Sequence, residues 1–104
     1  MYLEIIYFFH QVDEENFINS GYPRGDPEYP EMGIFAQRKK ERINRIGLCI
    51  VELLEAQDRT LKVKYLDAID GTPVIDIKPV FREFLPKGEV RQPPWVTEIM
   101  EHYW

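Results

Sequence analysis

Carboxylates crowd around one tight-turn signal in this chain, and such a group could bind a polar ligand. Asp67, Asp70 and Asp76 lie close together, with Lys78, around the dipeptide Asp70-Gly71. Backbone amides of a turn can bind a ligand while a carboxylate accepts hydroxyl or ammonium donors. The alternative is a structural hairpin in which Asp70 caps the turn and Asp76 pairs with Lys78 or faces solvent. Spacing alone favours the structural alternative.

A basic cluster interrupts an otherwise acidic chain. Arg38, Lys39, Lys40 and Arg42 are followed closely by Arg45. Such a cluster could bind the phosphates of a nucleic acid. An isolated run of this kind is more commonly a solvated charged face, and the spacing leaves both alternatives open.

His10 and Gln11 follow an apolar segment, at a position where a side chain could meet a ligand. A histidine at a strand end can donate a hydrogen bond or act as a base, although a lone histidine is more often structural. Two histidines and one cysteine show no ligand spacing, so we expect no metal site. The chain contains no nucleophile-elbow, Walker or dinucleotide-binding motif.

Length and composition limit the classes of protein to consider. The 104 residues, 44% of them hydrophobic, predict one globular domain over 1–104. A formal net charge of -5 disfavours a general nucleic-acid binder. The single cysteine excludes an intrachain disulfide and is typical of a reducing cytoplasm, where we expect the protein to act. No apolar run approaches membrane-spanning length, so no membrane attachment is expected.

Apolar segments separated by turn residues predict a mainly β chain that positions these groups. Aromatic, β-branched and alternating residues predict strands over 2–9, 33–37, 61–65 and 74–77. Pro79 ends the last of these strands because proline cannot donate to the ladder. Glycines and prolines predict loops over 19–30 and 81–92, and Pro94 predicts the start of a short helix.

Residues 38–57 carry a pattern that fits two structures. Apolar residues fall at helical spacing at Ile43, Ile46, Ile50, Leu53 and Leu54. Gly47 in the interior and the β-branched pair at 50–51 oppose a helix. The pattern alone favours a helix slightly.

Several motifs taken in order resemble one family, the TsaA-like (YaeB or TrmO-type) family. The motifs are FFHQ at 8–11, GIFAQR at 33–38, RINRIGL at 42–48 and DAIDGTPVIDIKP at 67–79. The segment from GEVRQP at 88–93 to the final Tyr-Trp is similar to one branch of that family. The resemblance implies an open or partly closed antiparallel β-barrel with long loops and a short C-terminal helix. It also implies an extended loop over 38–46 and a strand over 47–54.

The resemblance further implies an activity and a set of site residues. Family members are S-adenosylmethionine-dependent methyltransferases that form homodimers and N-methylate threonylcarbamoyladenosine in tRNA. Carried over by motif, the cofactor contacts would be His10, Gln11, Arg38, Leu48, Asp70, Gly71, Thr72 and Pro73. The residues facing tRNA would be Arg38, Lys39, Arg42, Asn44 and Arg45. Candidates for a catalytic role are His10, Asp76 and Lys78, and the weaker candidates for the cofactor ammonium are Asp67 and Asp76.

Two departures from the family pattern bear on function. Ile43 stands where the family loop usually has proline, which leaves the loop beside Asn44 less rigid. The family normally has several tens of residues before the strand predicted over 2–9, so the domain is expected to be short at its amino-terminal side. That expectation admits a fragment, a truncated paralogue or a barrel closed by partner chains. The functional alternatives are a non-catalytic homologue that binds S-adenosylmethionine or a nucleoside, and a methyltransferase for another small substrate.

Overall fold

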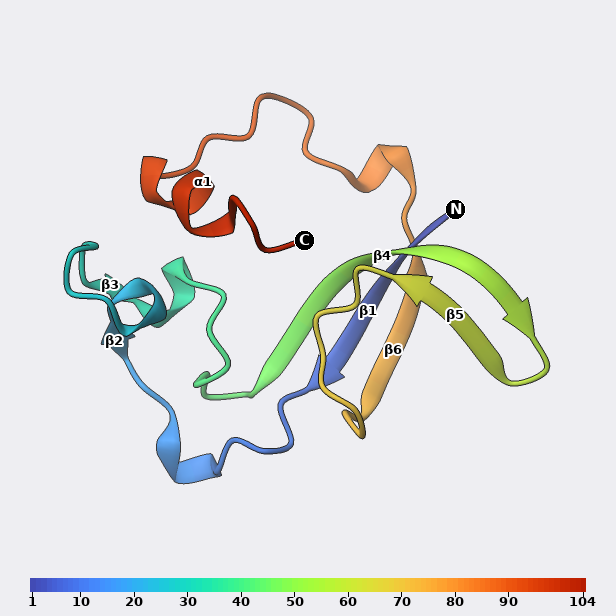
Figure 1. Ribbon diagram of the computed structural model, residues 1–104, viewed down its shortest axis with the longest axis horizontal. Helices are drawn as coiled ribbons and strands as arrows, with labels where there is room; N and C mark the ends of the chain where they lie inside the picture. The colour runs from blue at the N-terminus through green and yellow to red at the C-terminus, as the bar shows by residue number, and fades with distance from the viewer.

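The computed structural model describes residues 1–104, and its largest element is a four-stranded antiparallel sheet (Figure 1). The strands are β1 (Tyr2–Phe8), β4 (Ile46–Gln57), β5 (Thr60–Lys64) and β6 (Val74–Pro79), in the spatial order β5-β4-β1-β6. The sheet does not close into a barrel, because its edge strands β5 and β6 do not pair with each other. The prediction of a mainly antiparallel β fold with an open sheet and a short helix near the C-terminus is therefore confirmed.

The core lies on one face of the two central strands. Alternate residues of β1 and β4 are buried there, and the register pairs Leu3 with Val51 and Ile5 with Cys49. Successive side chains of a strand point to opposite faces of the sheet. Every second residue is therefore buried when only one face is covered. Val51 is completely buried, and Ala68 from the segment between β5 and β6 packs on the same cluster. The covering layer of this face therefore includes the segment that carries the acidic turn.

The remaining elements are short, and several of them form an arm beside the sheet. These short elements are β2 (Ser20–Gly21), β3 (Met32–Gly33), four 3-10 turns (Glu14–Asn16, Pro23–Gly25, Ile34–Ala36 and Arg82–Phe84) and the helix α1 (Pro94–Met100). Figure 1 shows β2, β3 and α1 grouped on the left, apart from the sheet. The buried Gln37 amide donates to the carbonyls of Gly21 and Met32 at 2.9 Å each, which ties both strands of the arm to the following loop.

The helix favoured by pattern over 38–57 is wrong, and the loop and strand implied by the resemblance are found instead. Residues 38–45 form no helix or strand, and β4 runs from Ile46 to Gln57. Close packing explains why the strand contains glycine: a Cβ at Gly47 would lie 2.5 Å from Tyr7 Cε2 and 2.9 Å from Phe9 Cζ. A strand with apolar residues on both faces can also place them three or four positions apart, so the helical spacing did not distinguish a helix from a strand.

The hairpin predicted around Asp70-Gly71 is also wrong. The strands before and after this turn, β5 and β6, lie at opposite edges of the sheet and do not pair with each other. β5 pairs with β4 and β6 pairs with β1, so residues 65–73 cross one face of the sheet (Figure 1). A local turn signal specifies the turn but not which strands pair across it.

Among the other elements, the short strand predicted over 33–37 and the loop predicted over 19–30 need correction, since that loop contains β2 and the turn Pro23–Gly25. β3 ends at Gly33, and residues 34–36 form a 3-10 turn that buries Ile34. The strands predicted over 2–9, 61–65 and 74–77 are confirmed as β1, β5 and β6, and β6 ends at Pro79 as expected. The helix predicted from Pro94 is confirmed as α1. None of the helices is long and apolar enough to cross a membrane.

Candidate functional site

A cleft of about 1260 Å³ lies among β4, the loop after β3, the start of the crossover segment and the chain after residue 90. Its lining contains five cationic side chains, Arg24, Arg38, Lys39, Arg42 and Arg91, but a single carboxylate, that of Asp67. The whole chain has 13 lysines and arginines against 18 acidic residues, so the cleft concentrates positive charge in an acidic protein. A concave surface of one sign focuses the field and attracts ligands of the opposite sign.

The cleft runs along a free edge of β4. The Leu53 N–H donates to the Met1 carbonyl, so the odd-numbered residues of β4 bond to the β1 side. The backbone groups of even-numbered residues therefore point to the other side, where β5 pairs only from Glu52 onward. At this edge the Leu48 carbonyl accepts a hydrogen bond from Arg38 Nη2 at 2.7 Å. The structure thus brings together two predicted cofactor residues, Arg38 and Leu48.

Arginine side chains hold the basic loop 38–45 in shape. Arg42 Nη1 donates to the carbonyls of Gln37 at 2.5 Å and Lys39 at 3.2 Å. Arg45 Nη1 donates to the Val12 carbonyl at 2.8 Å, and its guanidinium lies 4.7 Å from the centre of the Phe8 ring. Of the residues predicted to face tRNA, Arg38, Lys39 and Arg42 line the cleft, whereas Asn44 and Arg45 do not.

Asp67 links the sheet to the C-terminal segment at the wall of the cleft. Its backbone carbonyl accepts a hydrogen bond from the hydroxyl of the buried Tyr7 at 2.8 Å. Its carboxylate Oδ2 accepts a short hydrogen bond from the Tyr103 hydroxyl. Desolvation, followed by the hydrogen bond to Asp67 and its negative charge, raises the pKa of Tyr103 to about 12. Desolvation and the charge of Asp67 also raise the pKa of Tyr7.

The acidic turn lines a second, smaller cavity of about 320 Å³. Asp70, Gly71 and Thr72 form part of its wall, and Tyr7 lines both this cavity and the cleft. Gly71 has a positive φ of 86°, which favours glycine at this position. A Cβ there would lie 4.0 Å from His10 Nε2, so the structure places the imidazole of His10 beside the turn.

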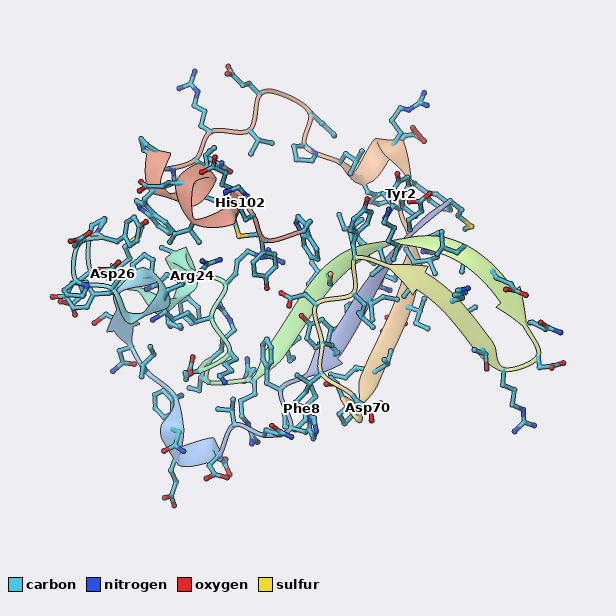
Figure 2. The ribbon with its side chains drawn as sticks, viewed as in Figure 1. Tyr2, Phe8, Arg24, Asp26, Asp70 and His102 are labelled. Carbon is cyan, nitrogen blue, oxygen red and sulfur yellow. The ribbon has the colours of Figure 1, made fainter.

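Figure 2 shows the end of the sheet where β1 stops, with Phe8 and Asp70 both at that end and Arg24 on the arm. The Phe8 N–H donates to the Pro73 carbonyl at 3.0 Å, which anchors the turn to β1. Gln11 is exposed, and neither it nor Pro73 lines either cavity. Apart from Gln11, the predicted cofactor residues therefore fall into two groups, one at the turn beside His10 and one at the free edge of β4.

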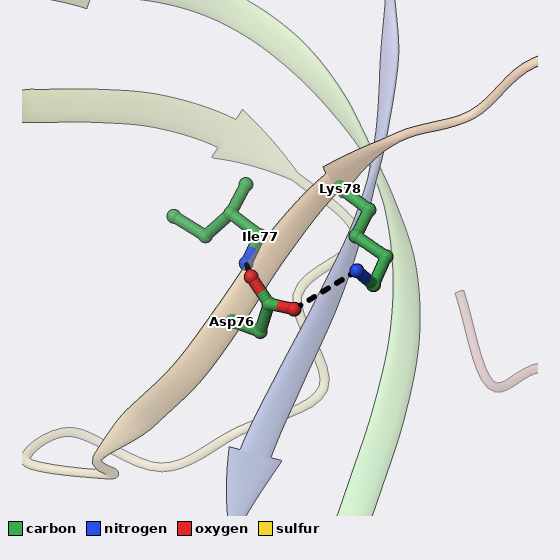
Figure 3. A network of polar contacts seen from close by, with 3 residues as sticks. All are labelled: Asp76, Ile77 and Lys78. Carbon is green, nitrogen blue, oxygen red and sulfur yellow. Dashed lines mark hydrogen bonds and ion pairs between the residues drawn. The ribbon is translucent and has the colours of Figure 1, made fainter.

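Asp76 and Lys78 form an exposed ion pair on β6. Lys78 Nζ lies 3.1 Å from Asp76 Oδ2, and the other carboxylate oxygen accepts a hydrogen bond from the Ile77 N–H at 2.8 Å (Figure 3). The hydrogen bond from Lys78, then that from Ile77, holds the pKa of Asp76 below its usual value. The expected pairing is confirmed. Neither residue lines either cavity, so a catalytic role for this pair stays a prediction.

The aromatic wall of the cleft was not predicted from the sequence. It comprises Phe35, Tyr65, Trp95, Tyr103 and Trp104, with Arg24 and Arg91 as further cations. Phe35, Tyr65 and the C-terminal group at 95–104 lie far apart along the chain, and no spacing connects the three regions. The signal available in the sequence was only the closing Tyr-Trp pair. No group of three histidine, cysteine, aspartate or glutamate side chains is arranged to hold a metal ion.

Some known proteins resemble this chain in sequence, and solved structures resemble it in fold. An S-adenosyl-L-methionine-binding protein of Archaeoglobus fulgidus is 55% identical over 56 residues, which are 54% of this chain and 39% of that protein. The tRNA (adenine(37)-N6)-methyltransferase of Escherichia coli is 41% identical over 91 residues, 82% of this chain and 39% of that protein. The crystal structure of TrmO from Pseudomonas aeruginosa matches with a TM-score of 0.67 at 26% identity, covering 90% of this chain and 37% of that chain.

The model of one protein family, described as the tRNA-methyltransferase O N-terminal domain, matches residues 1–84. That range contains the whole sheet, the basic loop and the acidic turn, and it leaves out α1 and the Tyr-Trp pair. The chain spans well under half the length of both curated relatives described above. The match covers most of the residues, so this chain belongs to the tRNA-methyltransferase O N-terminal domain family.

Proposed function

We propose that this chain binds S-adenosylmethionine and methylates a nucleoside of tRNA. The observation that carries the proposal is the cleft, where five cations and several aromatic rings line the surface of an acidic protein. Positive charge with exposed aromatic rings is the combination that binds unpaired nucleic acid, because cations meet phosphates and rings stack on bases. The names of the relatives agree with it, since one is an S-adenosyl-L-methionine-binding protein and another a tRNA (adenine(37)-N6)-methyltransferase.

The residues at the turn and at the β4 edge fit the polar groups of the cofactor. Arg38 uses one donor on Leu48 and has others available for a carboxylate. The N–H groups of Asp70 and Gly71 donate to no backbone carbonyl, so they can bind ribose or adenine acceptors. His10 lies beside that turn and can donate to the same ligand. The hydrogen-bond donors of these four residues match the acceptors of the cofactor, and this match supports their proposed assignment.

Bound S-adenosylmethionine supplies an activated methyl group for in-line transfer to a nucleophile. The contribution of this chain is to position both reactants. In this proposal Arg38 in the cleft and the turn in the smaller cavity hold different parts of the cofactor, and Tyr7 lines both cavities. The basic loop orients the phosphates of the acceptor strand. The acceptor nitrogen that we propose, N6 of threonylcarbamoyladenosine, is weakly basic, so a group that accepts its proton assists the reaction. His10 is the candidate for that step because it lies beside the turn.

Calorimetry followed by a transfer assay tests the proposal. The 104-residue chain is titrated with S-adenosylmethionine and then assayed for methyl transfer to tRNA that carries threonylcarbamoyladenosine. Binding and transfer are the expected results. Binding without transfer would indicate a non-catalytic homologue. Transfer only to another acceptor would show that threonylcarbamoyladenosine is not the substrate. No binding at millimolar cofactor would contradict the proposed function altogether.

Substitution of the basic loop tests the assigned surface. Arg38→Glu is expected to weaken tRNA binding and to reduce the dependence of affinity on salt, because one fewer phosphate contact releases fewer counterions. Arg59→Glu is the matched control, since Arg59 is exposed in the β4–β5 turn and does not line the cleft. A loss of tRNA affinity that is independent of salt would show that Arg38 contacts no phosphate and serves the cofactor alone.

We also propose that the protein forms a homodimer through the uncovered face of its sheet. Side chains that alternate with the core residues project from that face, and Ile46, Leu48 and Ile50 are all exposed there. These three residues also line the cleft, so a second copy on this face would border the cleft. Ile6 and Phe8 of β1 continue the same apolar surface, because the register pairs them with Leu48 and Ile46. Contiguous exposed apolar side chains of this kind mark interaction surfaces.

A further inference from the structure

Trp104 presents a large aromatic ring at the wall of the cleft, outside the residues that the family model covers. The side chain is 64% exposed and lines the cleft, and the family match ends at residue 84. An exposed tryptophan lacks the stabilisation that burial of its ring would give, so a role in binding would explain its exposure.

Two neighbouring rings fix the position of this indole. Tyr65 lies 5.7 Å from it at an interplanar angle of 80°, and Tyr103 lies 4.9 Å from it at 89°. Both contacts are edge-to-face, which is a favoured arrangement of aromatic pairs. The Tyr103 hydroxyl is in turn held by the Asp67 carboxylate. The exposed ring is therefore anchored from two directions, so little conformational entropy remains to be lost when a ligand binds it.

The backbone at Tyr65 supports the same conclusion. Tyr65 has a positive φ of 74°, a conformation that a bulky residue rarely adopts. The Cys49 thiol donates to the Tyr65 carbonyl at 3.0 Å and holds this conformation in place. Strain of this kind persists only where surrounding contacts impose it, and here it presents the Tyr65 ring to the cleft beside Trp104.

Positive charge beside these rings indicates the class of ligand. Arg24 lies with its guanidinium 5.8 Å from the centre of the Tyr103 ring, and Arg91 lines the same cleft. A ring that stacks and cations that bind phosphate or carboxylate together recognise a nucleotide. An aromatic peptide would satisfy the ring but not the excess of cations.

We propose that Trp104 is a stacking platform for a nucleobase that enters the cleft, with Arg24 and Arg91 binding the attached anionic group. The inference rests on the proposed function and adds to it a binding element that lies beyond the family domain. Adenine occurs both in S-adenosylmethionine and in RNA, so the shared ligand chemistry is a purine ring and the experiment separates its two sources.

Fluorescence of Trp104 in a Trp95→Phe background measures the contact directly, because Trp104 is then the only indole. The probes are S-adenosylmethionine, single-stranded oligoadenylate and a sugar-phosphate strand of equal length without bases. Saturable quenching by a base-bearing probe, and none by the abasic strand, is the expected result. Quenching by the cofactor alone identifies its adenine as the ligand, and quenching by oligoadenylate alone identifies an RNA base.

Calorimetry of ring variants provides the energetic test. Trp104→Leu is expected to weaken binding of the quenching probe about 5- to 150-fold and to leave the abasic strand unchanged, while Trp104→Phe restores part of the affinity. Phe84→Leu is the matched control, because Phe84 is 83% exposed and lies outside the cleft. Binding heat that is the same in Trp104→Leu would overturn the stacking proposal alone. No heat from any base-bearing probe with the wild-type chain would overturn the proposed function and the stacking proposal with it.

Discussion

Asp67 connects the core of the sheet to the C-terminal segment at the wall of the cleft. Its backbone carbonyl is bonded to the core through Tyr7, and its carboxylate is bonded to Tyr103 of the C-terminal segment. A hydrogen bond between a carboxylate and a hydroxyl is charge-assisted and stronger than a neutral one. This contact of the C-terminal segment therefore requires that the Tyr103 hydroxyl keep its proton.

Alkaline pH is expected to release this contact. The pKa of Tyr103 is raised to about 12 in the folded protein, above its usual value near 10, so the stabilisation is complete below about pH 10. It is lost as pH rises from about 10 through 12, because tyrosinate would face the Asp67 carboxylate. Across this pH range, the thermal unfolding temperature of the wild type is expected to fall more steeply than that of Tyr103→Phe. Identical pH profiles of the two proteins would contradict the assignment.

Acidic pH is expected to act on the Asp76–Lys78 pair in the opposite sense. The pKa of Asp76 is lowered in the folded protein, so its contribution to stability is present above the usual carboxyl pKa of about 4 and is lost as pH falls through the folded value. Lys78→Met is expected to raise the pKa of Asp76 toward its usual value, as followed by the carboxyl NMR shift. Lys62→Met is the control because β5 lies at the other edge of the sheet. An unchanged titration of Asp76 in Lys78→Met would refute the pairing.

At the scale of the elements, β1 and β4 pack so closely that one position between them admits no side chain. Gly47 faces Tyr7 across the register, and a Cβ would lie 2.5 Å from its ring. Gly47→Ala is expected to destabilise the fold by about 1–3 kcal/mol, the usual cost of overpacking a core, as measured by urea unfolding. Gly88→Ala is the control because a Cβ there has no neighbour within 4 Å. Equal stability of the two variants would show that the rings move aside.

At the scale of the whole molecule, the sheet is covered on one face and uncovered on the other. Only the face with Leu3, Ile5 and Val51 is buried, while Ile46, Leu48 and Ile50 stay exposed on the opposite one. If a second copy covers this surface, Ile50→Lys is expected to convert a dimer to a monomer in sedimentation equilibrium. Leu61→Lys is the control, because Leu61 is also exposed but belongs to the projecting β4–β5 hairpin. A monomeric wild type would contradict the proposed dimer.

Local patterns sufficed to predict much of the fold. Alternation and β-branched residues predicted β1, β5 and β6, and Pro94 predicted α1, because each depends on neighbours in the sequence. The resemblance carried by four short motifs corrected the helical pattern over 38–57. Pairing between strands was beyond these signals, since Asp70-Gly71 specifies a turn in a hairpin and in a crossover equally well.

The candidate site divides in the same way between sequence and tertiary structure. The basic loop and the acidic turn were visible in the sequence because their residues are contiguous. The aromatic wall was not, because Tyr65, Tyr103 and Trp104 meet only when the crossover segment and the C-terminal segment reach the same edge of β4. Sequence therefore sufficed for the chemical groups and the family, whereas the tertiary structure alone decided which of those groups share a cleft. The physical reason is that contacts between distant segments depend on the packing of the whole chain, which no local spacing encodes.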